Sequence, residues 1–163
     1  MRDNVSGHCL RAAAPGDLAS LMALEQSVEN APHWSEASWQ QVLAASVDDA
    51  NSPSGALQRK VLVAEVDAVV VGFVALQLVT GVAEIESLAV SAQHRRSGIG
   101  LALCRDGIAW AQSQLSQAIE LEVRASNTAA IALYQCLGFE VQGRRPGYYR
   151  GPVEDAVLMT RTL

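Results

Sequence analysis

The sequence lacks any pattern that would pair its few cysteines or bind a metal. Cys9, Cys104 and Cys136 are the three cysteines among 163 residues, and none belongs to a CxxC pair or a Cys/His metal-ligand spacing. An odd number without such spacing is typical of free thiols in a reducing compartment. Cys104 and Cys136 fall at apolar positions of expected helices, so we expect both to be buried as small hydrophobic side chains. We expect no metal site.

Long apolar runs and an excess of basic residues are also missing. The N-terminal residues 1–10 contain no apolar core of signal-peptide length, and the most apolar segment, 68–79, is too short to span a bilayer. These absences favour a soluble, cytoplasmic protein without a membrane partner. The formal net charge of −5 argues against nucleic acid as the main ligand, because proteins that bind phosphate backbones usually carry a basic face. A basic protein substrate remains compatible with this charge.

The composition is that of a chain that folds along its whole length. Half of the residues are apolar and fewer than a fifth are charged, without a low-complexity tract, an internal repeat or an obvious linker. A chain of this length can bury a substantial core without disulfides. We therefore expect one domain over residues 1–163, with a monomer as the default state.

The apolar patterning predicts a mixed α/β (α+β) fold in which most strands are antiparallel. The first half of the chain is expected to hold a strand at 8–13, helices that begin near Pro15 and Ser35, a surface loop at 48–58, and strands at 60–66, 68–79 and 82–90. Short turns between these three strands indicate an antiparallel meander. The second half is expected to begin with a helix that carries an apolar stripe of Leu101, Cys104, Ile108, Ala111 and Leu115. A strand at 118–124 and a helix at 127–137, ended by Gly138, are expected next. The last two strands are expected at 139–145 and 155–163.

Two glycines stand where the stripe-bearing helix begins, in the stretch HRRSGIGLAL at 94–103. Each glycine inside a helix costs about 1 kcal/mol relative to alanine, so Gly98 and Gly100 suggest that the backbone itself has a role. A strand, a turn of small residues and a helix with unpaired first amides make an anion site, and Arg95 and Arg96 add positive charge. A pyrophosphate fits such a turn. Tight packing alone would also explain the glycines, whereas the third glycine of a dinucleotide-binding GxGxxG and the Gly-Lys-Ser/Thr of a P-loop are both missing.

These residues resemble the GNAT superfamily of acetyl-CoA-dependent N-acetyltransferases. Arg95, Gly98 and Gly100 match the cofactor loop Arg/Gln-x-x-Gly-x-Gly/Ala of that family. The resemblance continues through ELEVRASNTAAIALYQCLGFEVQGRR, which is similar to the RimI-type subfamily that acetylates the N-terminal alanine of a small-subunit ribosomal protein. It covers residues 60–163, with a weaker similarity at 33–36.

The resemblance implies a fold, a cofactor and roles for particular residues. The implied fold is a single GNAT-like domain with helices on both faces of the sheet and a splay between the central strands, into which the pantetheine arm of acetyl-CoA inserts. In this family the general base corresponds to Glu122 and the general acid to Tyr134. The implied cofactor-binding positions are Leu88, Ala89 and Val90 beside the thioester, Arg95, Arg96, Ser97, Gly98, Ile99, Gly100 and Leu101 around the pyrophosphate, and Asn127 and Tyr134.

The residues by themselves leave the two catalytic roles open. Strand alternation puts Glu120 and Glu122 on one face, where both could be solvated carboxylates. Tyr134 lies two helical turns after Asn127 and could face the same ligand, although its spacing also suits a core tyrosine. Acetyl transfer to an amine needs a base for the nucleophile and a proton for the departing thiolate, and no metal. The resemblance favours Glu122 as the base, directly or through a water, and Tyr134 as the acid.

The acceptor amine is less closely defined than the cofactor. With a pKa of about 8, roughly a tenth of an α-amine is neutral at pH 7, a far larger fraction than for a lysine near 10.4. This favours a protein N-terminus, such as that of a small-subunit ribosomal protein. Trp34, Tyr148 and Tyr149 resemble the positions that shape the acceptor groove in this family, although they could equally be ordinary loop residues. His33 separates Pro32 from Trp34 and the connection at 151–153 is short, so the chain departs from the family pattern here.

Three functions therefore remain as hypotheses. The first is an N-terminal protein acetyltransferase of the RimI type. The second is a GNAT enzyme whose acceptor is a small amine, and the third is a non-catalytic module that binds acetyl-CoA as a sensor. The presence of both candidate catalytic residues ranks the third hypothesis last.

Overall fold

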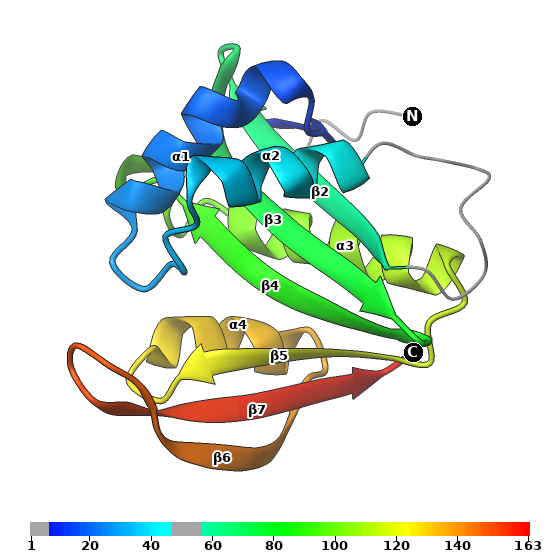
Figure 1. The fold of residues 1–163 in the computed structure, drawn as a ribbon, viewed down its shortest axis with the longest axis vertical. Coiled ribbons are helices and arrows are strands. Elements are labelled where there is room, and N and C mark those ends of the chain that lie inside the picture. Colours follow the sequence, from blue (N-terminus) through cyan, green and yellow to red (C-terminus); the bar gives the residue numbers. More distant parts are fainter. Residues whose placement is uncertain (1–6, 47–56) are drawn as a thin grey trace.

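One seven-stranded sheet organises the computed structural model, which describes residues 7–46 and 57–163. The strand order is β1-β2-β3-β4-β5-β7-β6 (Figure 1). β4 and β5 are parallel, and every other neighbouring pair is antiparallel, which confirms the expected mixed, mostly antiparallel sheet. The strands are β1 (Cys9–Ala12), β2 (Gln58–Val66), β3 (Val69–Val79), β4 (Val82–Val90), β5 (Ala118–Arg124), β6 (Glu140–Tyr149) and β7 (Glu154–Thr162).

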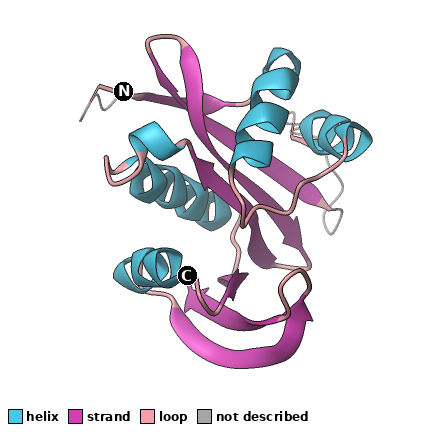
Figure 2. Ribbon diagram, turned by 90° about the vertical axis from the view of Figure 1, so that its left-hand side faces the viewer, coloured by secondary structure: helices cyan, strands magenta, loops and turns pink. Residues whose placement is uncertain are grey.

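Helices cover both faces of the sheet, as expected (Figure 2). On one face, α1 (Leu18–Ser27) and α2 (Glu36–Ala45) bury Leu21 and Trp39 against Phe73 of β3. On the other face, α3 (Ile99–Ser113) and α4 (Thr128–Cys136) pack on a second apolar cluster that includes Leu76, Ile119 and Met159. Short 3-10 turns, η1 (Pro15–Asp17) and η2 (Ala92–His94), precede α1 and α3.

Local sequence explains where several of these elements begin and turn. Ser35 caps α2, because its hydroxyl accepts a hydrogen bond from the Ser38 amide at 3.1 Å. Positive φ angles at Asp67 and Ala68, and at Thr80 and Gly81, form the two tight turns of the β2-β3-β4 meander. The loop expected at 48–58 lies outside the described residues up to position 56, and Gln58 already belongs to β2.

Two predictions about burial were wrong. Leu115 is 88% exposed because α3 ends at Ser113, so Leu115 follows the helix with a positive φ of 58°. Cys136 is exposed at the last residue of α4, which buries Tyr134 instead. Cys104 is buried as predicted, and burial raises the pKa of its thiol to about 12.

The central strands separate after a short parallel ladder. β4 and β5 are paired only over Val82–Glu84 and Ala118–Glu120, although β4 continues to Val90 and β5 to Arg124. Beyond the ladder, β4 stays paired to β3 and β5 stays paired to β7, so the sheet divides into two halves. Figure 1 shows β4 and β5 diverging towards their carboxyl ends. This confirms the expected splay.

Candidate functional site

The turn before α3 presents free backbone amides at the open end of the splay. Gly98 is the N-cap of α3 and has a φ of 84°, a left-handed conformation that favours glycine. The first intrahelical bond runs from the Ala102 amide to the Gly98 carbonyl at 2.9 Å. The three preceding amides, those of Ile99, Gly100 and Leu101, therefore point out of the helix end. Such amides, together with the helix dipole, attract an anion.

Gly98 and Gly100 are under different structural constraints. A Cβ on Gly98 would meet no atom within 4 Å, so its positive φ is the constraint. A Cβ on Gly100 would lie 3.6 Å from Leu133 Cδ2 and 3.8 Å from Val90 Cγ2, which is ordinary packing distance. Gly100 thus lies where α3, α4 and the end of β4 meet.

Polar side chains of the same turn are exposed and positively charged. Arg95 and Arg96 both lie on the surface, and Arg95 Nε donates to the Val90 carbonyl at 3.5 Å. The Ser97 hydroxyl donates to the His94 carbonyl, and the His94 ring bonds the Ser91 hydroxyl at 2.8 Å. His94 therefore has a structural role in shaping the turn.

Two further stretches expected at the cofactor border the splay. Leu88, Ala89 and Val90 lie on the part of β4 whose β5-facing edge has no ladder partner. Asn127 is the N-cap of α4, where its Oδ1 accepts from the Ala130 amide at 3.3 Å. The capping bond fixes the side chain of Asn127 and leaves its amide NH2 group available to a ligand.

The carboxylate of Glu122 lies on β5 beyond the ladder and is covered by groups from β6. Arg145 Nη1 is 3.2 Å from Glu122 Oε1. Tyr148 lies near the same carboxylate, and hydrogen bonding with Glu122 is the main cause that raises the pKa of Tyr148, because it favours the protonated phenol. The Glu122 side chain is 22% exposed, so solvent reaches it.

Tyr149 contacts two side chains close to Glu122. Its ring contacts that of Tyr148 edge-on, at 5.1 Å between centroids, and the Arg124 guanidinium lies over it at 4.3 Å. Arg124 is also paired with Glu154 at 3.4 Å. Burial, and next the negative charge of Glu122, raise the pKa of Tyr149.

Tyr134 is a buried phenol on α4. It is 6% exposed and meets Phe139 edge-on, at 5.7 Å between centroids. Burial is the main cause that raises the pKa of Tyr134, with smaller contributions from Cys104 and Tyr149. A phenol with a raised pKa is protonated at neutral pH and can donate a proton.

Trp34 is held against the core by a buried acid that the sequence did not single out. The carboxylate oxygen Oε2 of Glu25 accepts from the Trp34 amide at 3.0 Å and from Trp39 Nε1 at 2.8 Å. Glu25 is 1% exposed, and burial raises its pKa. The rings of Trp34 and Trp39 are 5.0 Å apart. Among the described residues, no ring contact or hydrogen bond joins Trp34 to Tyr148 or Tyr149, so the structure does not bring these candidates into contact.

Arg145 is the second residue that sequence reasoning missed. Glu122 and Arg145 are 23 positions apart on strands that are not neighbours, since β7 lies between them. The weak indication in the sequence was a pair of arginines just before the tyrosines of interest.

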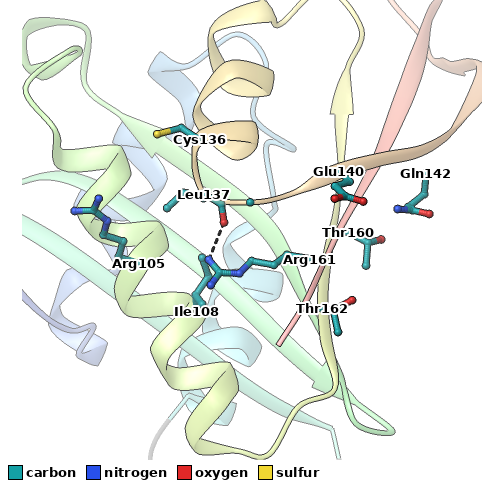
Figure 3. A pocket seen from close by; sticks show the side chains of 10 residues that line it. Arg105, Ile108, Cys136, Leu137, Glu140, Gln142, Thr160, Arg161 and Thr162 are labelled. Atoms are coloured by element: carbon teal, nitrogen blue, oxygen red, sulfur yellow. Dashed lines mark hydrogen bonds between the residues drawn. The ribbon is translucent and has the colours of Figure 1, made fainter.

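A cavity of about 760 Å³ lies elsewhere on the molecule, and none of the candidate site residues lines it. It is bordered by the middle of α3, the end of α4 and the β6-β7 pair (Figure 3). Within it, Arg161 Nη1 donates to the Leu137 carbonyl at 2.7 Å.

Residues 7–46 and 57–163 contain no group of three or more side chains that could hold a metal ion. In the same ranges, no helix has the length and apolar character needed to cross a bilayer.

Several known proteins similar to this chain are acetyltransferases. The ribosomal protein bS18-alanine N-acetyltransferase of Escherichia coli K12 is 42% identical over 74 residues, which are 44% of this chain and 50% of that protein. The N-alpha-acetyltransferase RimI of Mycobacterium tuberculosis is 38% identical over 74 residues, 45% of each chain. The matches thus span about half the length of these curated relatives.

Solved structures match over nearly the whole chain. The ribosomal-protein-S18-alanine N-acetyltransferase of E. coli has a TM-score of 0.78 at 28% identity, covering 95% of this chain and 93% of that one. A ribosomal-protein-alanine N-acetyltransferase from Brucella melitensis gives 0.79 at 26%, covering 94% and 99%. The model of the acetyltransferase (GNAT) family matches residues 22–139. With the splayed sheet and the amide-lined turn before α3, this match shows that the chain belongs to the GNAT family of acetyltransferases.

Proposed function

We propose that this protein is an acetyl-CoA-dependent N-acetyltransferase that modifies the N-terminal α-amine of a protein. The first acceptor to consider is the N-terminal alanine of a small-subunit ribosomal protein, because two similar solved structures are named for that activity. The observation that carries the proposal is the position of Glu122 beside the splay, whose open end is bordered by the free amides of α3.

The described residues suit acetyl-CoA. The amides of Ile99, Gly100 and Leu101, with Arg95 and Arg96 nearby, provide hydrogen-bond donors and positive charge for a pyrophosphate. The unpaired edge of β4 at 88–90 offers backbone groups to an amide-containing arm such as pantetheine. When bound, acetyl-CoA supplies the acetyl group as an electrophilic thioester.

Glu122 and Tyr134 then divide the proton transfers. Glu122 takes the proton that the acceptor nitrogen loses as its bond to the acetyl carbon forms. Tyr134 gives its proton to the sulfur as the carbon–sulfur bond breaks, so the products are an amide and a free thiol. Tyr134 is available for the second role because burial raises its pKa, so the phenol still carries its proton at neutral pH.

The acceptor is placed between Trp34 on one side and Tyr148 and Tyr149 on the other. These aromatic side chains come from the α1-α2 connection and from the end of β6. An α-amine suits a carboxylate base better than a lysine does, because a larger share of it is already neutral near pH 7.

Mass spectrometry of two peptides tests this proposal. Both are incubated with the protein and acetyl-CoA. The first peptide copies an alanine-starting ribosomal protein N-terminus, and the second has that terminus blocked but keeps an internal lysine. Acetylation of the first peptide alone supports the proposal. Acetylation of only small amines in a parallel panel would assign the small-molecule alternative, and cofactor binding without any product would indicate a sensor.

A further inference from the structure

We infer that Arg145 is an internal competitor of the acceptor: in the ligand-free protein its guanidinium occupies the place on Glu122 that the acceptor's ammonium takes. This inference rests on the proposed role of Glu122 as the base. The inference concerns how the acceptor binds and assigns no proton transfer to Arg145. Arg145 is therefore a positioning residue, because it acts through Glu122.

The contact geometry supports the competition. Arg145 Nη1 is 3.2 Å from Glu122 Oε1. The Arg145 side chain is 55% exposed and the Glu122 side chain is 22% exposed, so the guanidinium is the more exposed partner of the pair. An amine that binds Glu122 Oε1 from solvent would compete with this guanidinium for the same oxygen.

Arg124, a second cation close to Tyr149, is paired elsewhere. The Arg124 guanidinium lies 4.3 Å from the Tyr149 ring centre and is paired with Glu154, whose other oxygen accepts from the Ser126 amide at 2.6 Å. Arg124 thus belongs to a separate network, and Arg145 is the cation that neutralises Glu122.

Arg145 can leave without disturbing the sheet. The β6-β7 register breaks between Arg145 and Tyr149, and in this interval the Gly147 amide bonds the Asp155 side chain at 3.0 Å. The Tyr148 ring, 5.5 Å from the guanidinium, offers a second resting place for the cation. Exposed ion pairs are weak, so displacement costs the acceptor only a small factor in affinity.

The acceptor KM of the Arg145→Gln variant tests the inference directly. We expect this KM to fall about two- to fivefold, because an exposed ion pair contributes only a free energy of that size. We expect kcat to change less than about twofold. Arg145→Lys keeps the cation and is expected to keep the KM of the unchanged protein. Arg144→Gln is the matched control, because Arg144 lies next in sequence but is paired with Asp155 at 3.5 Å. A KM that stays the same or rises in Arg145→Gln, or a large loss of kcat, would overturn the inference.

A binding experiment separates this inference from the proposed function. Guanidinium ion is titrated into Arg145→Ala, and the side-chain carboxyl carbon of Glu122 is followed by 13C NMR. We expect the signal to respond at lower guanidinium concentration in Arg145→Ala than in the unchanged protein, and an equal response would contradict the competition. If the unchanged protein acetylates no peptide, the proposed acceptor is contradicted. The guanidinium titration still tests the competition in that case, because it does not depend on turnover.

Discussion

At the scale of single residues, burial decides what each ionisable group in the site can do. Tyr134 is buried and keeps its proton, whereas Glu122 is reached by solvent and is contacted by two groups of β6. The proposed acid and the proposed base therefore lie in contrasting surroundings, as a reaction that moves protons at both ends requires.

Substitution of either residue is expected to reduce turnover while leaving cofactor binding intact. Glu122→Gln and Tyr134→Phe remove a proton acceptor and a proton donor, so we expect kcat to fall about 10²-fold or more in each variant. Calorimetric titration with acetyl-CoA is the accompanying measurement, and its affinity should stay within a few fold. Unchanged kcat in both variants would reject the assigned roles.

Glu25 links stability to pH. Burial raises its pKa in the folded protein, so the folded state binds a proton more tightly than the unfolded state does. The free energy of unfolding therefore loses this contribution as pH rises from the ordinary glutamate pKa, about 4.3, through the raised folded value. Urea unfolding of the unchanged protein and of Glu25→Gln measures this contribution. As pH rises, the free energy of unfolding should fall less in the variant than in the unchanged protein. Identical pH profiles would mean that Glu25 does not titrate differently on folding.

At the scale of elements, the start of α3 combines a strained turn with a helix end. Gly98 needs its positive φ, whereas Gly100 is an ordinary helical position beside Leu133 and Val90. The two glycines look alike in sequence, and only the backbone conformation separates them.

The two alanine variants of these glycines should therefore differ. A left-handed conformation costs a residue with a Cβ about 1–2 kcal/mol, so we expect Gly98→Ala to lower the free energy of unfolding by about that amount. Gly100→Ala is the matched control; its added methyl meets only contacts at 3.6 Å and beyond, and it removes a poor helix former. Thermal or urea unfolding measures both, and equal destabilisation would contradict this distinction.

Much of the fold could be predicted from sequence because each strand and helix carries a regular apolar pattern. The strands of the meander and the α3 stripe at Cys104, Ile108 and Ala111 follow that pattern and are found where expected. The exposure of Leu115 and Cys136 could not be predicted in this way, because it depends on where a helix ends and what covers that end. The contact between Glu122 and Arg145 was equally out of reach, since it arises from strand order and from the register break in β6.

At the scale of the whole molecule, two half-sheets are joined along one short seam. Three residue pairs form the parallel ladder, and Ser116 strengthens it at its closed end. The Ser116 hydroxyl accepts from the Ala83 amide at 3.1 Å and lies 2.8 Å from the Ala118 carbonyl, which connects the starts of β4 and β5.

Loss of this hydroxyl should weaken the entire fold. Ser116→Ala leaves the buried Ala83 amide and the part-buried Ala118 carbonyl with fewer partners, so we expect the free energy of unfolding to fall by about 1–3 kcal/mol. Ser113→Ala is the comparison, because that hydroxyl bonds the Trp110 carbonyl on the exposed side of α3. If urea unfolding shows that Ser116→Ala loses no more free energy of unfolding than Ser113→Ala does, the seam does not depend on Ser116.

The early end of the β4-β5 ladder also determines how the protein exchanges its amide hydrogens with solvent. Amides of β4 and β5 that point into the gap have no strand partner to slow deuterium uptake, whereas those pointing to β3 and β7 remain protected. A ligand that fills the gap would slow exchange along both facing edges at once. Occupancy of the gap could therefore be read from the exchange of the protein's own amides.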